Sequence, residues 1–213
     1  MPERSLCLLI GYLFGCFLTA EVIIKIKTGQ SVSQFGTGNP GMANVMRIFG
    51  FRTGAAVLIG DLCKTVAACI LCCYLFGRSP VVTGGAPLGQ TAVLWAGLGA
   101  AIGHNWPFWR RFRGGKGVAV TCMAIFLFSP LWGLIADIAG MLVVFRTGFL
   151  PLGAVVITTL FTVFAGVFYG MEPCLLALAL ALIMLSRHYP GLIRSLKGTE
   201  EKNAQYLKRK NKL

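Results

Sequence analysis

Seven long apolar stretches constrain what this chain can fold into more than any other feature. They span residues 6–24, 53–76, 91–102, 118–128, 131–145, 150–168 and 174–185. Several approach the roughly 20 apolar residues that a helix needs to cross a bilayer. Of the 213 residues, 56% are hydrophobic and only 13% are charged, which is more apolar than soluble domains usually are. The sequence therefore predicts an all-α, polytopic integral membrane protein with about seven transmembrane helices joined by short loops.

The net charge of +13 is not spread evenly along the chain. Basic residues gather in every second connection: after the first, third and fifth apolar stretches, and again after the seventh. Cytoplasmic loops of membrane proteins carry such an excess of Lys and Arg. The pattern therefore argues against a nucleic-acid-binding protein. It predicts a cytoplasmic C-terminus and an N-terminus on the outer side.

The same rule bears on the number of spans. Residues 118–145 could form one helix kinked at Pro130, which would give six spans and leave Arg146 and the basic tail outside. Seven spans place every basic connection in the cytoplasm. We therefore expect seven spans in a single membrane domain over residues 1–213, which ends in a basic cytoplasmic tail at 187–213. We expect no cleaved signal peptide, because no clean small-residue cleavage site follows the first stretch.

Four ionisable residues stand within or at the ends of the apolar stretches: Glu21, Asp61, Lys64 and Asp137. Such groups are costly in lipid and usually face a cavity or a partner. Asp61 and Lys64 are three residues apart, so they can pair on one face of a helix. Two interpretations remain open for this pair. It either holds helices together as a buried ion pair or takes part directly in a polar active site.

Two glycine-rich, basic segments lie between apolar stretches, at residues 36–47 (the first glycine segment) and 103–117 (the second glycine segment). Glycine is costly in conformational entropy, so stretches this rich in it indicate a close approach of the backbone to a ligand. Arg and Lys beside backbone N–H groups favour an anion, above all a phosphate, and helix N-termini add to this. Lys116 would supply a point charge and Arg47 a bidentate clamp. Flexible loops that contact lipid headgroups would explain the cations but not the glycines.

Neither segment is a nucleotide-binding motif. Residues 36–41 fit G-x-G-x-x-G literally, but the expected strand is absent before them, and residues 114–117 lack the spacing and the Lys-Ser/Thr ending of a P-loop. Carboxylates are too sparse for a metal-dependent phosphotransferase, and no G-x-S-x-G elbow is present. The eight cysteines lie in or beside apolar stretches and are expected to pack as small apolar residues. We therefore expect a mechanism without metal, cofactor or covalent enzyme intermediate.

The only two histidines, His104 and His188, each follow an apolar stretch at its predicted cytoplasmic end. A lone histidine at the membrane interface is more often structural than functional. Here both fall on the same predicted membrane face as the two glycine segments. This shared placement favours a role in the site.

Three blocks of this chain resemble the signature blocks of the bacterial acyl-phosphate:glycerol-3-phosphate acyltransferase family. The first glycine segment is similar to the family's Gly-Ser-Gly-Asn-Pro-Gly-Ala-Thr-Asn-x-x-Arg, with Thr37 in place of serine and Ala43 in place of threonine. Downstream, similarity to the family pattern extends over Asp61-Leu-Cys-Lys64, Gly103-His104 with Pro107, Phe112 to Ala119, Arg187-His188, Arg194 and Gly198-Thr-Glu200. The blocks occur in order over nearly the whole chain.

The resemblance implies a seven-span enzyme of the bacterial inner (cytoplasmic) membrane with its active site on the cytoplasmic face. Such an enzyme moves a fatty acyl group from acyl phosphate to the sn-1 hydroxyl of glycerol 3-phosphate, giving lysophosphatidic acid and phosphate in the first step of phospholipid synthesis. The expected partners are acyl phosphate, glycerol 3-phosphate and membrane lipid. The soluble enzyme that makes acyl phosphate is a further candidate, and nucleic acid is not expected.

The resemblance also implies roles for particular residues. Those predicted to be catalytic are Thr37, His104, Lys116 and His188. Those predicted to bind substrate or phosphate are Gly36, Gly38, Asn39, Gly41, Asn44, Arg47, Asp61, Lys64, Arg113, Gly114, Gly115, Gly117, Arg187 and Glu200. An acyl phosphate carries a good leaving group, so the enzyme mainly has to position its substrates and stabilise developing charge.

The third block departs from the family's Arg-His-Arg-x-Asn, because Tyr189 and Gly191 stand in place of Arg and Asn. This departure leaves open a diverged paralogue with an altered acceptor. Judged from the family pattern alone, Gly191→Asn restores the family's residue and is expected to keep or raise activity. An organic-anion transporter is a second alternative, although no paired broken helices are apparent in the two halves. A scaffold that binds anionic lipid is a third, and it would leave the glycines unexplained.

Overall fold

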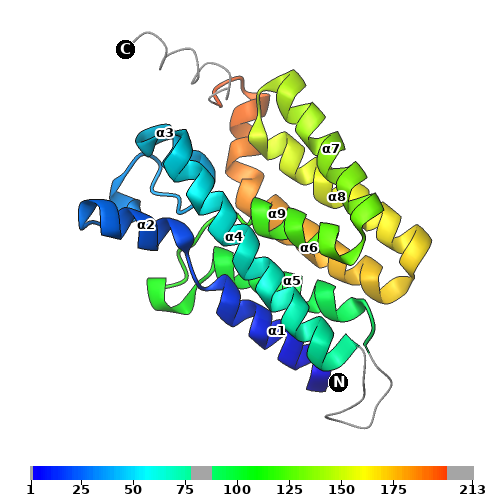
Figure 1. Ribbon diagram of the computed structural model, residues 1–213. Coiled ribbons are helices and arrows are strands. Elements are labelled where there is room, and N and C mark those ends of the chain that lie inside the picture. Colours follow the sequence, from blue (N-terminus) through cyan, green and yellow to red (C-terminus); the bar gives the residue numbers. More distant parts are fainter. Residues whose placement is uncertain (1, 78–87, 201–213) are drawn as a thin grey trace. The chain divides into compact units, whose positions relative to one another are not determined.

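The computed structural model describes residues 2–77 and 88–200 (Figure 1). Every regular element within these ranges is a helix, as the sequence predicts. The helices form two compact units that divide between Phe128 and Ser129, and each unit is described by itself. The single membrane domain expected over the whole chain stays a prediction.

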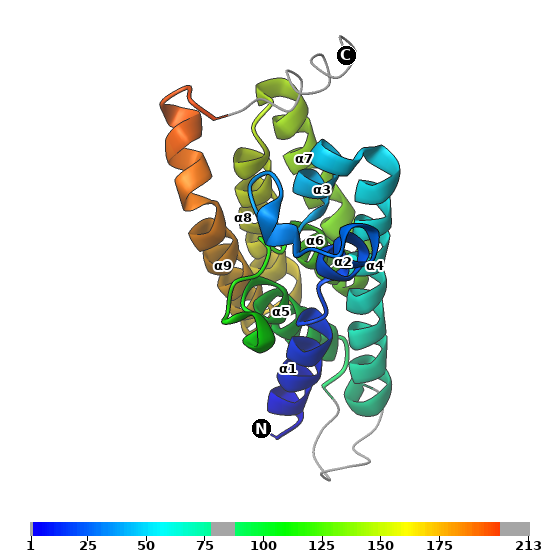
Figure 2. The same ribbon diagram turned by 90° about the vertical axis from the view of Figure 1, so that its left-hand side faces the viewer.

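The first unit contains six α-helices and three short helical turns among its described residues. They are α1 (Pro2–Gly15), α2 (Thr19–Thr28), η1 (Val32–Gln34), α3 (Met42–Phe49), α4 (Phe51–Cys72), η2 (Cys73–Gly77), α5 (Thr91–Asn105), η3 (Phe108–Arg110) and α6 (Val118–Phe128). Helix α1 packs along α5, and α4 contacts α1, α5 and α6. Figures 1 and 2 show α2 and α3 beside α4, away from the N-terminal end of α1.

Glycines bring α1 and α5 into backbone contact. Gly11 and Gly15 of α1 are spaced as G-x-x-x-G, and so are Gly99 and Gly103 of α5. A Cβ at any of these four positions would collide with backbone atoms of the facing helix. Small residues at this spacing let membrane helices approach closely. The α1–α5 pair is therefore held in one register.

The first apolar stretch does not form a single helix. The chain breaks between Gly15 and Thr19, where Leu18 has an extended backbone and α2 begins. Helix α2 then packs with η1, α3 and α4 around a fully buried cluster of five apolar residues: Ala20, Ile24, Val32, Val45 and Val57. The rings of Phe35 and Phe49 meet edge-on at 5.1 Å beside this cluster. This small core positions the first glycine segment.

The second unit contains α7 (Pro130–Thr147), α8 (Leu150–Tyr169) and α9 (Met171–Leu196), with α8 packed against both of the others. Pro130 starts α7, where the missing N–H of proline costs nothing because the first N–H groups of a helix have no partner within it. Helix α9 continues to Leu196 through Pro190. The predicted tail is therefore helical up to residue 196, and its part from 201 onward lies outside the described residues.

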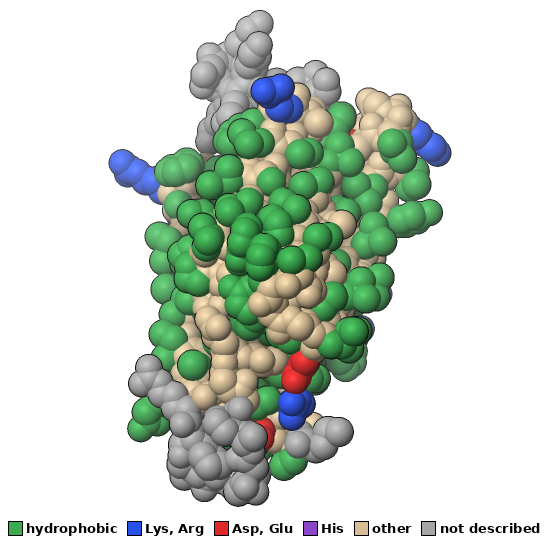
Figure 3. All heavy atoms as spheres, turned by 90° about the vertical axis from the view of Figure 1, so that its right-hand side faces the viewer, with side chains coloured by type: hydrophobic (Ala, Val, Ile, Leu, Met, Phe, Trp, Pro, Cys, Tyr) green, Lys and Arg blue, Asp and Glu red, His purple; other side chains and the backbone are tan. Residues whose placement is uncertain are grey.

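Five helical stretches among the described residues are long and apolar enough to span a membrane. They are Pro2–Thr28, Phe51–Gly77, Pro130–Thr147, Leu150–Tyr169 and Met171–Leu196, and the apolar helix α6 is shorter. Apolar side chains are spread over the face drawn in Figure 3. Helix α7, for example, exposes several large hydrophobic residues between Leu131 and Phe145. These surfaces are typical of a protein with several membrane helices. The count of seven spans stays a prediction.

Candidate functional site

Helix α1 ends against the middle of α4, on the side chain of Lys64. Lys64 lies about 13 residues after the start of α4, which is roughly 20 Å along the helix axis. Its Nζ donates to the carbonyl oxygens of Phe17 at 2.6 Å and Gly15 at 3.3 Å. The last carbonyls of a helix have no partner within the helix. The Lys64 ammonium satisfies them and also places a positive charge at the negative end of the α1 dipole.

Two other side chains donate to the carbonyls of the residues that directly follow α1 and α5. The Trp109 indole N–H donates to Cys16 O at 2.8 Å, and the Tyr12 hydroxyl donates to Trp106 O at 3.1 Å. A buried carbonyl without a partner would be costly in an apolar environment. The two helix ends and the second glycine segment therefore form one hydrogen-bonded structure.

The second glycine segment folds back over the end of α5. Gly114 N–H donates to Asn105 O at 3.0 Å, and Gly115 N–H donates to His104 O at 2.9 Å. A Cβ at Gly114 would collide with these same two carbonyls, and a Cβ at Gly115 would overlap the His104 imidazole. Gly117 has φ +76°, and a Cβ there would lie 2.8 Å from Asn105 Oδ1. The glycines here let the segment lie directly against the end of α5, and the N–H groups of Gly114 and Gly115 bond to α5 carbonyls and not to a ligand.

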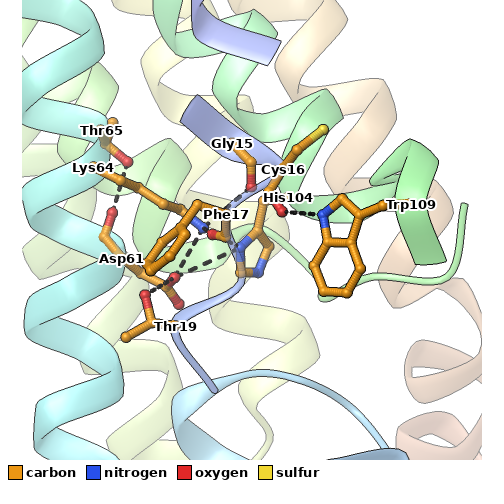
Figure 4. A network of polar contacts seen from close by, with 9 residues as sticks. All are labelled: Gly15, Cys16, Phe17, Thr19, Asp61, Lys64, Thr65, His104 and Trp109. Carbon is orange, nitrogen blue, oxygen red and sulfur yellow. Dashed lines mark hydrogen bonds and ion pairs between the residues drawn. The ribbon is translucent and has the colours of Figure 1, made fainter. Parts of the chain in front are cut away.

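A buried polar network lies beneath this segment (Figure 4). Lys64 Nζ is 2.9 Å from Asp61 Oδ1 and 2.9 Å from His104 Nδ1. The Thr19 hydroxyl donates to Asp61 Oδ1 at 3.0 Å. Asp61 and Lys64 are 3% and 6% exposed, so their polar atoms serve protein partners. The structure shows the buried ion pair and joins it to His104. A direct contact of Asp61 or Lys64 with a substrate stays a prediction.

The first glycine segment is held by Asn44 of α3. Asn44 is buried; its Oδ1 accepts from Thr37 N–H at 2.9 Å and its Nδ2 donates to Phe35 O at 3.0 Å. Gly36 and Gly38 adopt left-handed φ values of +59° and +70°, which favour glycine. The loop therefore leaves Thr37 exposed beside Gly38. Asn44 supports the loop, and its direct contact with a substrate stays a prediction.

A basic pocket of about 390 Å³ joins the two glycine segments. It is lined by Ser33, Gly38, Trp109, Arg110, Arg111, Arg113 and Gly114. Three arginines in one concave site are suited to bind a phosphate, because guanidinium groups form charge-assisted, bidentate hydrogen bonds with phosphate oxygens. The pocket brings together three of the residues that the sequence predicted for the site, Gly38, Arg113 and Gly114; their contact with a substrate stays a prediction. Thr37 and Asn39 lie on the same loop as Gly38, while Lys116 and Gly117 lead into α6.

Four residues of the pocket were not singled out from the sequence: Ser33, Trp109, Arg110 and Arg111. Arg110 Nη2 lies 3.4 Å from Glu21 Oε2 and 3.3 Å from Ser31 Oγ, so it ties the second glycine segment to α2 and η1. Arg111 has a left-handed φ of +53°, which is uncommon for a residue with a side chain. For Arg110 and Arg111 the sequence signal was the run of basic residues itself, and the partners of Arg110 are distant in the chain.

Asn105 is a further residue that the sequence did not single out. It is fully buried, and neither its Oδ1 nor its Nδ2 has a hydrogen-bond partner among the described residues. Both atoms face Gly117, at the start of α6. Buried amides are usually hydrogen-bonded, so this side chain has room to bond a water molecule or a ligand. The Gly-His-Asn sequence at the end of the α5 stretch was its only signal.

Arg187, His188 and Glu200 belong to the second unit, so their part in a shared site stays a prediction. His188 is buried within α9, and Arg187 precedes it. Glu200 Oε2 accepts from Arg194 Nε at 2.6 Å, which holds the chain after α9 against the last turn of that helix. No group of three or more His, Cys, Asp or Glu residues is placed to hold a metal in residues 2–77 and 88–200. Independence from metals stays a prediction.

Gly191→Asn is expected to destabilise the protein, in contrast to the expectation from the alignment. Gly191 is buried on α9, and a Cβ there would lie 2.7 Å from Pro151 Cγ of α8. Inserting a side chain into such a contact typically costs about 1–3 kcal/mol. The thermal midpoint in detergent should fall and activity should not rise. Ser186→Asn, on the exposed side of α9, is the control, and higher activity at unchanged stability would support the alignment instead.

Comparisons with known proteins point to one family. Residues 5–198 match the family model described as glycerol-3-phosphate acyltransferase. The chain is 36% identical to glycerol-3-phosphate acyltransferase 1 of Lactobacillus johnsonii, over 86% of this chain and 84% of the relative. It is 32% identical to the glycerol-3-phosphate acyltransferase of a Thermoanaerobacter species, over 92% of this chain and 94% of the relative.

Solved structures extend the comparison to the fold. The chain resembles the crystal structure of PlsY, an integral membrane glycerol 3-phosphate acyltransferase, in its glycerol 3-phosphate form. The TM-score is 0.80 at 26% identity, covering 93% of this chain and 94% of PlsY. The lysophosphatidic acid form of PlsY matches with a TM-score of 0.78 at 25% identity and the same coverage. Taken with its apolar helices, the likeness identifies the chain as an all-helical integral membrane protein, and it belongs to the glycerol-3-phosphate acyltransferase family.

Proposed function

We propose that this protein transfers a fatty acyl group from acyl phosphate to the sn-1 hydroxyl of glycerol 3-phosphate, giving lysophosphatidic acid and phosphate. The observation that carries the proposal is the basic pocket that joins the two glycine segments, in a chain of the acyltransferase family. Both substrates carry a phosphate, and the pocket offers three arginine side chains from the second glycine segment. The PlsY structures in the glycerol 3-phosphate and lysophosphatidic acid forms support the same acceptor and product.

In the proposed reaction, the hydroxyl oxygen of glycerol 3-phosphate attacks the acyl carbon. The bond from that carbon to the phosphate oxygen breaks, and the released phosphate takes up the hydroxyl proton, so the reaction is balanced. Negative charge develops on the acyl oxygen and on the leaving phosphate. Lys116 and the pocket arginines would stabilise this charge, and Thr37 and Asn39 on the Gly38 loop would orient the acceptor. His188, Arg187 and Glu200 are proposed to complete the site.

We further propose that the protein lies in the bacterial inner membrane as one domain with seven spans. The named relatives are bacterial proteins. The alternation of basic connections supports an N-terminus outside and a C-terminus and active site in the cytoplasm. Membrane lipid would then supply and receive the acyl chain. The soluble enzyme that makes acyl phosphate remains the candidate protein partner.

The test is an acyl-transfer assay with purified protein in lipid nanodiscs. Palmitoyl phosphate and labelled glycerol 3-phosphate should give labelled lysophosphatidic acid, at a rate unchanged by a metal chelator. Palmitoyl-CoA in place of palmitoyl phosphate should give none. A folded protein that forms no product from palmitoyl phosphate would contradict the proposal. Product with another acceptor would then indicate a diverged paralogue, and uptake of labelled glycerol 3-phosphate into sealed vesicles without product would indicate a transporter.

A further inference from the structure

Lys64 is surrounded by hydrogen-bond acceptors. Its Nζ contacts Phe17 O at 2.6 Å, Asp61 Oδ1 at 2.9 Å and Gly15 O at 3.3 Å. The fourth contact is His104 Nδ1 at 2.9 Å. Two carbonyl oxygens and a carboxylate can only accept, and an ammonium group can only donate. The geometry therefore fits a charged Lys64 that donates to the atoms around it.

This arrangement dictates which ring nitrogen of His104 carries the proton. A neutral imidazole has one N–H donor and one acceptor nitrogen. Lys64 has three N–H groups for four contacts, and the three shorter contacts, at 2.6, 2.9 and 2.9 Å, include His104 Nδ1. Because Lys64 has only protons to offer, Nδ1 is the acceptor. The Asp61 carboxylate does not compete as an acceptor for an Nδ1 proton, since its Oδ1 is 3.8 Å away, beyond hydrogen-bond distance. The proton of a neutral His104 therefore resides on Nε2.

The protonated nitrogen points toward the second glycine segment. Nε2 of His104 is the atom nearest to where a Cβ of Gly115 would lie, so the absence of that side chain brings the ring against the backbone of this segment. A second proton, on Nδ1, would face the Lys64 ammonium across 2.9 Å. Two like charges at this distance in a buried site repel strongly. His104 is thus arranged to donate one proton in a hydrogen bond and not to accept another.

We propose that Asp61 and Lys64 are positioning residues that hold His104 as the neutral Nε2–H tautomer, so that His104 serves acyl transfer as a hydrogen-bond donor and not as the general base. The part that concerns catalysis rests on the proposed function. The Nε2–H group would steady the second glycine segment and the substrate oxygen that gains negative charge beside it. The hydroxyl proton of the acceptor would then leave with the released phosphate and not on His104. This gives a specific role to His104, which the sequence predicted only to be catalytic.

The tautomer is tested directly by solid-state 15N NMR of histidine-labelled protein in lipid bilayers near neutral pH. The chain has only two histidines, and His188→Gln assigns the remaining signals to His104. We expect one protonated and one unprotonated ring nitrogen, with coupling that identifies Nε2 as the protonated one. An Nδ1–H tautomer or a doubly protonated ring would overturn the proposal. This measurement needs no substrate, so it stands even if the acyl-transfer assay fails.

The positioning role is tested by removing the ion pair as a unit. Deleting one partner of a buried pair is strongly destabilising, whereas replacing both with apolar residues is often tolerated. The double variant Asp61→Leu/Lys64→Met is therefore compared with wild type for thermal midpoint, kcat and the His104 spectrum. We expect a folded protein, a mixture of His104 tautomers, and a kcat lower by about 10-fold or more, as when a group that orients a catalytic histidine is lost.

The control is Thr65→Val, which removes a buried hydroxyl one residue after Lys64. Thr65 Oγ1 donates only to Asp61 O within the same helix, so this change should leave the tautomer and kcat near wild type. A folded double variant with wild-type kcat would show that the pair is merely structural, which overturns the positioning role. If the double variant does not fold, the wild-type spectrum still decides whether His104 is the Nε2–H tautomer.

Discussion

Gly115→Ala is expected to lower kcat/KM for acyl transfer by about 100-fold or more in a protein that still folds. The added methyl group would occupy the position of the His104 imidazole, so the ring or the second glycine segment has to move. Its neighbour is a side chain that can shift and not a helix backbone, so the helices should keep their packing. A displacement of about 1 Å at a reacting group is enough for a loss of this size. Initial rates with palmitoyl phosphate and glycerol 3-phosphate, together with the thermal midpoint, measure the effect.

Gly29→Ala is the matched control for this substitution. Gly29 caps α2 with φ +73°, and no atom lies within 4 Å of the position that its Cβ would take. The alanine there strains the backbone locally but meets nothing, so turnover should stay near wild type. If Gly115→Ala retained wild-type kcat/KM, the close packing of His104 under the second glycine segment would not matter for catalysis.

Lys116→Ala is expected to lower kcat/KM by roughly 10²–10³-fold, with little change in thermal stability. Lys116 is half-buried between Gly115 and the start of α6, where its ammonium would stabilise charge on the leaving phosphate. Because that charge grows in the transition state, most of the loss should fall on kcat. Lys116→Arg should recover part of the activity, since it keeps the charge but changes its geometry. Rates at several concentrations of each substrate separate kcat from KM.

The control for Lys116 is Lys25→Ala, which removes an exposed cation from α2. If the lysines only attract anionic substrates by their charge, the two variants should lose similar amounts of kcat/KM, and both losses should become smaller at high salt. A specific phosphate contact would affect Lys116→Ala alone. Wild-type kcat in Lys116→Ala would remove this residue from the proposed mechanism.

The helices that the sequence predicted best are those that end at local signals. The stretches 118–128, 131–145 and 150–168 correspond closely to α6, α7 and α8. Proline begins α7, and Gly148 in a left-handed conformation ends it. These residues act within their own turn of helix, so their effect can be read from neighbours in the chain.

The break between α1 and α2 could not be predicted in the same way. Residues 6–18 are continuously apolar, and nothing in that stretch alone requires the helix to stop after Gly15. The break persists because Lys64 and Trp109, distant in the chain, satisfy the exposed carbonyls. Helix α9 extends further than the apolar stretch 174–185 indicated. The sequence after this stretch is basic and contains proline, which suggested a tail, but the helix continues to Leu196 and Gly191 packs closely against Pro151 of α8.

For the candidate site, the sequence indicated which residues to consider but not what each of them contacts in the fold. Residues of both glycine segments line the basic pocket. Gly114 and Gly115, however, use their N–H groups to bond α5, and Asn44 bonds the first glycine segment. Glycine and asparagine show from sequence that the backbone is approached closely. They do not show whether a ligand or the protein approaches it, because both need the same residue types.

The C-terminal ends of α1 and α5 both contact Lys64, and this limits how the sequence can change in evolution. An α-helix turns by about 100° per residue, so deleting one residue from α1 would swing its last carbonyls away from Lys64 and Trp109. The same deletion in α5 would turn His104 out of reach of Lys64. Point substitutions on the outer faces of α1 and α5 leave this register intact. The lengths of α1 and α5 therefore depend on each other, and among relatives insertions or deletions in these helices should be far rarer than substitutions.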